Sequence, residues 1–294
     1  MSQAPEFLSV GHITRDMHSD GSFSLGGTVT FAALTAYHLG LASSIVTCAD
    51  QELIAVLPEM LPDISVHARP SAATTTFVNI YTETGFRTQY LRARADALVE
   101  SDIPSEWQAA PVVLLGPLAQ ELDADFAALF PRRPGRIVAA TPQGWLRHWD
   151  NDGRVWPTPW QAAEQVLPAL DVLILSHDDL LPFANDNRKD ADAILARWSM
   201  QVPLLVATDG RHGATLFRQG NTQRFPAYPI NEVDPTGAGD VFAASFITHL
   251  YRHGNAEDAV NFANCVASFS AEQPGIQGIP TPEMINARLS TALR

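Results

Sequence analysis

Cysteine, positive charge and long apolar runs are all scarce in this sequence. Among its 294 residues only Cys48 and Cys265 are cysteines, and neither belongs to a Cys-x-x-Cys or Cys/His cluster. This pattern predicts reduced, structural cysteines and no zinc site. No apolar run approaches the roughly 18 residues that a membrane span needs, and the N-terminus has no basic region followed by an apolar stretch. We therefore expect a cytoplasmic protein with no membrane partner.

Charge is also sparse, and its balance is acidic. Charged residues make up 17% of the chain, and the formal net charge is −13. A protein with this balance has no field that draws it to nucleic acid or to an anionic membrane. We expect a small-molecule ligand and no nucleic acid. An anionic nucleotide would have to be bound locally, by backbone N–H groups, a few arginines and Mg²⁺.

Short apolar runs recur along the chain, and 46% of all residues are apolar. The runs lie at residues 7–10, 44–48, 112–115, 137–140, 172–175 and 204–207. Their length and β-branched content predict buried strands. Alanine- and leucine-rich segments with helical spacing, such as 31–39 and 191–198, lie between several of them. The alternation predicts an α/β fold with a mainly parallel sheet that is covered on both faces.

One region departs from this alternation. Residues 74–81 and 87–94 alternate polar and apolar side chains on either side of Glu83-Thr84-Gly85, as expected for a half-exposed hairpin. Such a hairpin could be a flap over a cleft or an ordinary surface hairpin, and the pattern does not decide between them. The short interval from Asp16 to Gly26 predicts little room for a full pair of lid strands. We find no repeat, low-complexity tract or linker, so we expect one domain over residues 1–294.

The most informative segment is Asp234-Pro-Thr-Gly-Ala-Gly-Asp240, which leads directly into a helical pattern with a long apolar face. In a first helical turn, the N–H groups of Gly237, Ala238 and Gly239 can hold a phosphoryl oxygen, helped by the positive end of the helix dipole. Asp240 in the same turn can take the proton from an attacking hydroxyl. The turn alone is equally consistent with a carboxylate that only complements a helix N-terminus.

Further motifs occur in a fixed order along nearly the whole chain. Gly26-Gly27 precedes a helical segment that ends at Leu39-Gly40, and Asp16 lies upstream of both glycines. Residues 263–267 and 274–280 follow the glycine-rich turn. Together with residues 234–240, these motifs resemble those of the ribokinase family, the PfkB-type carbohydrate kinases. Their order supplies the context that a single motif lacks.

The resemblance implies a ribokinase-like three-layer α/β sandwich with a small β lid formed by segments near 12–25 and 74–95. It also implies an ATP-dependent phosphotransferase that phosphorylates a hydroxyl of a small sugar or cyclic polyol, with Asp240 as general base. The segment from Thr208 to Gly213 resembles the family's nucleotide loop. The nucleotide-binding residues implied in this way are Thr208, Gly210, Arg211, Gly213, Asn264 and Ala267. A solvated loop arginine explains Arg211 equally well.

The expected metal sites depart from the family pattern. Family members commonly have Asn-x-x-Glu before the nucleotide loop, where it orders Mg²⁺, and the matching stretch here is Ser176-His177-Asp178-Asp179. Asp179 would take the place of the glutamate and hold Mg²⁺ through water, because this ion keeps several waters and needs few protein ligands. His177 is more typical of a hydrogen-bonded residue than of a ligand. Asp234 and Thr236 match positions where relatives bind K⁺, and K⁺ dependence stays open.

The acceptor side also differs from ribokinase. Ribokinase has Gly-Gly-Lys-Gly-Ala-Asn, whose asparagine binds the sugar, and this chain has Phe31 at that position. Because a phenyl ring cannot hydrogen-bond a ribose hydroxyl, the sequence disfavours ribose and leaves a differently shaped polyol open. The aromatic residue after the glycines resembles that of plant inositol kinases of the family, and this resemblance implies inositol or a related cyclic polyol. The substrate-binding candidates are Asp16, Gly26, Gly27, Phe31, Gln143 and Arg147. Residues 141–147 follow a strand at the edge where open sheets bind ligands. A tight turn with Trp145 packed on the core explains them as well.

Other function classes are compatible with parts of the sequence. The altered segment 176–179 leaves room for a non-catalytic nucleotide- or metabolite-binding protein on the same fold, and a nucleoside kinase is a further alternative. A nicotinamide-dependent oxidoreductase would need Gly-x-Gly-x-x-Gly after the first strand, and residues 10–16 lack it. As partners we expect a sugar or polyol and ATP, and a homodimer is left open.

Overall fold

A large sheet forms the centre of the computed structural model, which describes residues 4–81 and 87–292. Its strands are β1 (Phe7–Val10), β4 (Ser43–Ala49), β5 (Ser65–Pro70), β8 (Val112–Leu115), β9 (Ile137–Ala140), β12 (Val172–Ser176), β13 (Leu204–Thr208), β14 (Ala214–Arg218) and β15 (Asn221–Phe225). In the described residues they lie in the order β15-β14-β13-β12-β9-β8-β1-β4-β5. All neighbours from β13 to β5 are parallel, and β14 and β15 extend the sheet in antiparallel pairing.

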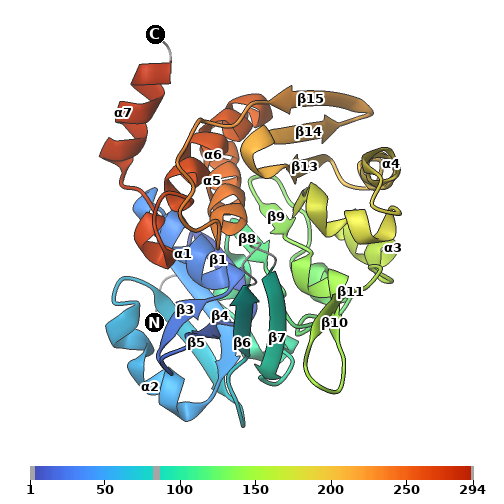
Figure 1. The fold of residues 1–294 in the computed structure, drawn as a ribbon. Coiled ribbons are helices and arrows are strands. Elements are labelled where there is room, and N and C mark those ends of the chain that lie inside the picture. The colour runs from blue at the N-terminus through green and yellow to red at the C-terminus, as the bar shows by residue number, and fades with distance from the viewer. Residues whose placement is uncertain (1–3, 82–86, 293–294) are drawn as a thin grey trace.

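Helices cover both faces of this sheet (Figure 1). They are α1 (Thr28–His38), α2 (Gln51–Met60), α3 (Ala163–Val166), α4 (Arg188–Trp198), α5 (Ala238–His253) and α6 (Ala256–Ser270), whereas α7 (Pro282–Ala292) lies outside these layers and contacts α6. Successive residues of a strand point to opposite faces. Phe7 accordingly belongs to a core with α1, α5 and α6, and Leu8 to a second core with α3 and α4. The three-layer α/β prediction is therefore confirmed. None of the helices in the described part of the chain has the length and apolarity to cross a membrane.

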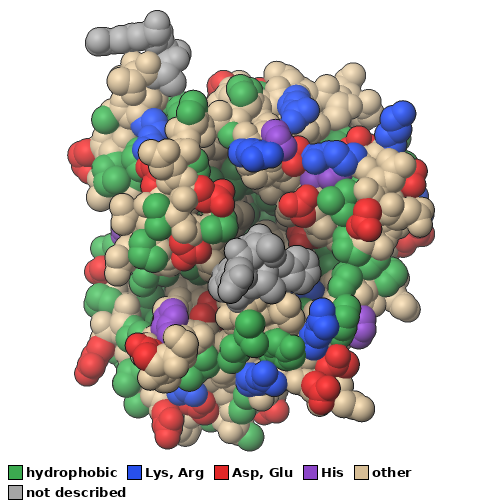
Figure 2. All heavy atoms as spheres, viewed as in Figure 1, with side chains coloured by type: hydrophobic (Ala, Val, Ile, Leu, Met, Phe, Trp, Pro, Cys, Tyr) green, Lys and Arg blue, Asp and Glu red, His purple; other side chains and the backbone are tan. Residues whose placement is uncertain are grey.

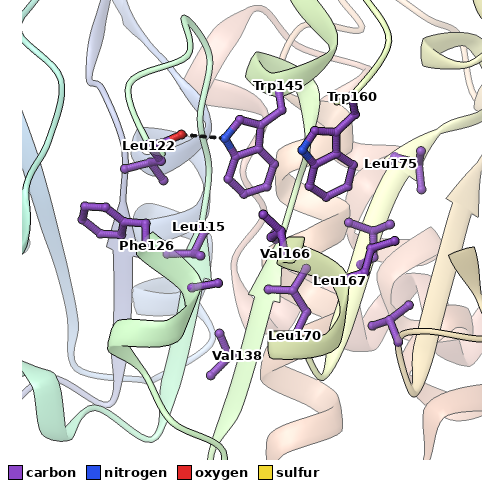
Figure 3. Close-up of a cluster of buried hydrophobic side chains, with 14 of the residues drawn as sticks. Leu115, Leu122, Phe126, Val138, Trp145, Trp160, Val166, Leu167, Leu170 and Leu175 are labelled. Carbon is purple, nitrogen blue, oxygen red and sulfur yellow. Dashed lines mark hydrogen bonds between the residues drawn. The ribbon is translucent and has the colours of Figure 1, made fainter. Parts of the chain in front are cut away.

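Three tryptophans pack together in the second core, and Figure 3 shows two of them, Trp145 and Trp160. Trp145 stacks on Trp160 with ring centroids 4.9 Å apart, and Trp160 meets Trp198 edge-on at 5.4 Å. The indole N–H of Trp145 donates to the carbonyl of Leu122 at 2.7 Å. Trp145 lies in the short helix Gln143–Leu146, which begins just beyond β9. Packing of Trp145 thus fixes the residues on either side of it at the carboxyl edge of the sheet, and contact of Gln143 or Arg147 with a substrate stays a prediction.

A second sheet of four strands lies beside this edge (Figure 1). Its strands are β2 (Thr14–Met17), β3 (Phe23–Gly26), β6 (Thr76–Tyr81) and β7 (Arg87–Ala93), in the order β3-β2-β6-β7. The predicted hairpin supplies β6 and β7, and Glu83-Thr84-Gly85 lies outside the described residues. The expectation of little room for a strand pair between Asp16 and Gly26 is wrong. Four-residue strands suffice there because a tight turn joins them, with the N–H of His18 donating to the carbonyl of Ser22.

A buried carboxylate joins the two sheets. Glu121 is fully buried and accepts hydrogen bonds from the backbone N–H groups of His12, Leu118 and Ala119. The His12 ring pairs in turn with the hydroxyl of Thr75, 2.7 Å from Nδ1. A buried carboxylate needs such partners, because an unpaired one would be expensive to desolvate. These bonds hold the small sheet against the carboxyl ends of β1 and β8.

Candidate active site

A cavity of about 550 Å³ lies between the small sheet and the carboxyl edge of the large sheet, on the face shown in Figure 2. Three carboxylates from distant segments line it: Asp16 of β2, Asp179 beyond β12 and Asp240 of α5. The sequence predicted all three. Gly27, Phe31, Gln143, Arg147 and residues 236–239 also line this cavity. The structure thus brings most of the predicted substrate-binding and catalytic residues into one space.

The glycine-rich turn forms the floor of the cavity. Gly237 is the N-cap of α5 and has a left-handed backbone, with φ at 79°. The N–H of Ala238 donates to the carbonyl of Pro235 at 3.1 Å, which corrects its predicted place in the anion hole. In the described residues, the N–H groups of Gly237, Gly239 and Asp240 have no hydrogen-bond partner. These three groups, at the positive end of the α5 dipole, are therefore the ones that can bind an anion.

Asp240 is partly exposed on this floor. The hydroxyl of Thr28 donates to its Oδ1 at 2.8 Å. The pKa of Asp240 is raised from 3.8 to about 6, and burial is the largest cause. The hydrogen bond from Thr28 and the charge of Arg147 lower this pKa, whereas the charges of Asp179 and Asp16 raise it. A carboxyl with this pKa is ionised at neutral pH and can still accept a proton readily, as a general base must.

The glycine signature of α1 shapes the acceptor side of the cavity. A Cβ on Gly26 would overlap the carboxylate of Asp16, and a Cβ on Gly27 would lie 2.5 Å from the carbonyl oxygen of His12. Both positions therefore require glycine if Asp16 is to lie over the start of α1. Phe31 is 3% exposed, and its ring lies where a Cβ on Gly237 would be. The Phe31 ring therefore packs against Gly237 in the anion-binding turn, and it also lines the cavity.

Two amides of the small sheet, which the sequence did not single out, face the same cavity. Asn79 of β6 and Gln89 of β7 lie opposite each other in register, and Gln89 Nε2 donates to Asn79 Oδ1 at 3.0 Å. Both line the cavity. The alternating pattern predicted the hairpin, but it could not say which of its faces turns toward the cleft, because that depends on the pairing of β2 with β6.

The candidate magnesium residue lies at the cavity wall. Asp179 Oδ2 accepts from the N–H of Ser176 at 3.1 Å, and Asp178 lines the cavity beside it. No cluster of three or more metal-binding side chains occurs among the described residues. Mg²⁺ does not need one, since it takes one or two carboxylates together with phosphate oxygens and water. His177 is 6% exposed and pairs through Nε2 with Asp192 at 3.1 Å, as expected for a hydrogen-bonded histidine.

The oxygens considered for K⁺ have structural partners. Asp234 accepts from the N–H of Thr236 at 2.9 Å and from that of Gly275 at 3.2 Å. The carbonyl of Ala271 accepts from the N–H groups of Val233 and Asp234. These bonds tie the segment before α5 to the loop after α6. K⁺ binding would have to use the remaining lone pairs and stays a prediction.

A second cavity, of about 380 Å³, lies between the loop after β13 and α6. All six predicted nucleotide-binding residues line it, together with apolar side chains. The predicted residues are Thr208, Gly210, Arg211, Gly213, Asn264 and Ala267, and the apolar neighbours include Tyr228, Ile230 and Phe242. Thr208, Gly210, Pro235, Ala238 and Gly239 border both cavities, so the two spaces meet at the glycine-rich turn.

An ion-pair cluster fixes the loop between the cavities. Asp209 pairs with Arg188, with Arg224 at 3.6 Å and with His212 at 3.5 Å. Its backbone N–H donates to the carbonyl of Gly213 at 2.7 Å. Figure 2 shows basic side chains gathered on this part of the surface, near β14, β15 and α4 of Figure 1. The acidic chain thus has cationic groups beside the second cavity.

Comparison with known proteins shows which proteins this chain resembles. The model of the pfkB family carbohydrate kinases matches residues 149–284, a range that contains the loop after β13 and the glycine-rich turn. This part of the chain is similar to that family. Among individual relatives, probable fructokinase-5 of Arabidopsis thaliana is 29% identical over 168 residues, which are 52% of each chain. Inositol 3-kinase of Oryza sativa subsp. japonica is 36% identical over 52% of this chain and 37% of its own. The chain spans about half the length of the fructokinases that it matches.

Two other comparisons cover more of this chain. Cytidine kinase of Thermococcus kodakarensis is 25% identical over 87% of this chain and 92% of its own. The solved structure of a pyrophosphate-dependent kinase in the ribokinase family, complexed with a pyrophosphate analog and myo-inositol, has a TM-score of 0.78 at 23% identity and covers 92% of this chain and 98% of its own. At that identity the structural match shows the fold, which is the ribokinase fold predicted from the sequence.

Proposed function

We propose that this chain is a PfkB-type, ATP-dependent kinase that phosphorylates a hydroxyl of a small cyclic polyol, with inositol as the leading acceptor class. The proposal rests on the place where the two cavities meet. They meet at the glycine-rich turn of α5, where unpaired N–H groups lie beside Asp240. A donor in one cavity and an acceptor in the other would bring a phosphoryl group and a hydroxyl together over an anion-binding turn and a base.

In this mechanism the acceptor hydroxyl lies against Asp240, and the transferring phosphoryl group lies over the N–H groups of Gly237 and Gly239. As the new oxygen–phosphorus bond forms and the bond to ADP breaks, Asp240 takes the hydroxyl proton. The N–H groups stabilise charge on the phosphoryl oxygens without reorganising. Asp179 would hold Mg²⁺ through water, and the ion when bound supplies charge neutralisation of the phosphates. Positioning and charge do most of the catalysis.

The shape of the second cavity favours ATP as the donor. Pyrophosphate has no base, so a donor site for it needs only anion contacts. Here the cavity continues past the turn for about 380 Å³ and has apolar walls from Tyr228, Ile230 and Phe242, which suit the flat, largely apolar face of a purine. Because proteins with this fold include pyrophosphate-dependent kinases, the identity of the phosphoryl donor has to be tested for this chain.

A blocked second cavity tests the donor. Ala267 of α6 lines it, and we expect Ala267→Trp to raise the KM for ATP at least about tenfold, because the indole occupies the space of the base. Asn261→Trp, at an exposed position of the same helix, is the matched control and should keep the parent KM. Steady-state ADP release measures both. If the parent enzyme turned over at least as fast with pyrophosphate as with ATP, the assignment of ATP as the donor would be wrong. The protein would still be a kinase.

The lid amides favour a neutral polyol as the acceptor. After Gln89 donates to Asn79, the amide NH₂ of Asn79 and the amide oxygen of Gln89 still have hydrogen-bonding capacity. A hydroxyl both donates and accepts, so neighbouring hydroxyls of a polyol match this pair, with Asp16 as a further acceptor on the same side of the cavity. The names of an inositol 3-kinase and of a kinase complexed with myo-inositol among the relatives agree with this choice.

The acceptor is tested with a panel of inositols, sugars and nucleosides in a coupled assay of ADP release, with and without K⁺. We expect the highest kcat/KM for an inositol. A nucleoside kinase is the second candidate, favoured by the cytidine kinase match over 87% of this chain, and preference for a nucleoside would establish it. Tight ligand binding without turnover on any acceptor would instead indicate a non-catalytic binding protein.

The activity should depend on pH through Asp240. The base must be ionised, and its pKa is raised to about 6. We therefore expect kcat/KM to fall roughly tenfold per pH unit well below that pKa and to reach a plateau above about pH 7. A profile of kcat/KM measured in buffers of constant ionic strength checks this. A flat profile through the pKa of Asp240 would contradict its role as base.

We also infer a cytoplasmic location for the enzyme. Cys48 and Cys265 are both free and buried, which fits a reducing compartment that supplies ATP. A homodimer stays open, and light scattering of the purified protein decides it.

A further inference from the structure

Thr28 is a buried polar residue at the start of α1 that contacts the proposed base directly. It is fully buried, and its hydroxyl donates to Oδ1 of Asp240 at 2.8 Å. The two residues are 212 positions apart in the sequence. Thr28 follows the glycine pair of α1, and Asp240 lies in the first turn of α5, so this single bond joins the starts of the two helices that border the cavity.

The methyl group of Thr28 packs closely against the backbone of Gly116. A Cβ on Gly116, just beyond β8, would lie 2.5 Å from Cγ2 of Thr28. The N–H of Gly116 donates to the carbonyl of Val10 at 2.9 Å, which fixes this backbone to the neighbouring strand. Because a threonine side chain is stiff at χ1, fixing the methyl also fixes the direction of the hydroxyl. The hydroxyl therefore points at Asp240 before any ligand binds.

We propose that Thr28 is a positioning residue for the general base: its hydroxyl holds Oδ1 of Asp240, so that Oδ2 faces the acceptor hydroxyl and receives its proton. This inference rests on the proposed kinase function. Thr28 keeps its own proton throughout and donates to Oδ1 before and after transfer. The proton that moves is that of the acceptor, which passes to Oδ2 as its oxygen bonds to phosphorus and the bond to ADP breaks.

The bond also has an electrostatic role among the charges around Asp240. Arg147, beyond the Trp145 turn, favours the ionised carboxylate, whereas Asp179 and Asp16 oppose it from the other walls of the cavity. A hydrogen bond donated to the carboxylate favours its ionised form. Without the Thr28 hydroxyl, the pKa of Asp240 would rise further, because burial is the largest effect on it.

Thr28→Val tests the proposal, since valine keeps the methyl that packs on Gly116 and removes only the hydroxyl. We expect kcat to fall about 10- to 100-fold at neutral pH, and the acid limb of the kcat/KM profile to move to higher pH. Thr28→Ser, which keeps a hydroxyl, should have the same pH profile as the parent. Thr35→Val is the matched control, because Thr35 is a buried threonine of the same helix whose hydroxyl donates to the carbonyl of Phe31; its profile should equal that of the parent.

If Thr28→Val had the pH profile and the kcat of the parent, the proposal would be overturned. The side chain of Thr28 would then serve only in packing. If the valine variant does not fold, comparison of Thr28→Ser with Thr28→Ala isolates the hydroxyl in the same way, and equal profiles for these two would also overturn it. A second readout needs no substrate. Thermal unfolding of the parent, Thr28→Val, Asp240→Ala and the double variant gives the coupling between the two side chains, because alanine, unlike asparagine, cannot accept the hydrogen bond of Thr28. We expect the two effects to be non-additive. If the effects of the two substitutions on stability were fully additive, the hydrogen bond between Thr28 and Asp240 would be contradicted. Lack of turnover in the parent would contradict only the proposed function.

Discussion

Replacement of Asp240 by asparagine is expected to lower kcat by about 10³-fold or more, within the range that a positioned base contributes. Asparagine keeps the shape of the side chain and can still accept the hydrogen bond of Thr28, so the cavity and the anion-binding turn should stay intact. Donor binding should therefore change little. Steady-state turnover together with calorimetric binding of the donor measures both quantities. Parent-like turnover would exclude Asp240 as the base.

The same variant should be more stable than the parent at neutral pH. Because the folded pKa of Asp240 is raised from 3.8 to about 6, ionisation of the carboxyl opposes folding as pH rises through this interval. The penalty relieved at about pH 7 has an upper limit of about 3 kcal/mol from the size of the shift, and it is smaller in practice because Asp240 is partly exposed. Below the unfolded pKa both proteins are neutral at this position, so the difference should vanish.

Asp258→Asn provides the matched control. Asp258 also lies in the first turn of a helix, but it is exposed on α6 and away from the cavities. This variant should keep the parent kcat, and its thermal unfolding should show no gain at neutral pH. A stability gain shared by both variants would mean that it reflects the net charge of the protein rather than the burial of Asp240.

The central sheet could be predicted because its strands carry a local signal. Runs such as residues 112–115 are apolar on both faces, and this is the pattern of parallel strands under two helical layers. The small sheet was harder. Its strands β2 and β3 have only four residues each, and their stability depends on pairing with β6 from a distant segment. Strand pairing between distant segments leaves little trace in either segment alone.

The same distinction separates the site residues that the sequence predicted from those it did not. The turn at residues 234–240 is local, so its chemistry could be inferred from one segment. Thr28 contacts Asp240 from 212 positions away in the sequence, and the direction in which Asn79 and Gln89 face depends on the pairing of β6 with the distant strand β2. The residue types of all three are common at surfaces. The role of Ala238 was wrong for a related reason, since a hydrogen bond within the turn consumes its N–H. Adjacency to the glycine pair was the one available signal for Thr28.

Any side chain at Gly237 should damage the glycine-rich turn in two ways. The φ of 79° at Gly237 is unfavourable for alanine, and a Cβ would overlap the ring of Phe31. We expect Gly237→Ala to lower the free energy of unfolding by about 2–4 kcal/mol, from backbone strain and overpacking together. Because the turn must move to relieve the overlap, the unpaired N–H groups change direction, and kcat should fall about 10²- to 10³-fold, the effect of losing an oxyanion donor.

Gly239→Ala separates the fold from the function at this turn. A Cβ on Gly239 meets no protein atom within 4 Å, and alanine in a helix is favoured over glycine by roughly 1 kcal/mol, so this variant should be at least as stable as the parent. Its methyl group, however, would project where both cavities meet and should raise the KM for the donor. Phe31→Leu in the Gly237→Ala background should recover part of the lost stability, because it relieves the overlap and not the strain in φ. Parent-like stability and kcat in Gly237→Ala would mean that the turn tolerates a side chain, and the anion-binding geometry proposed for it would then be wrong.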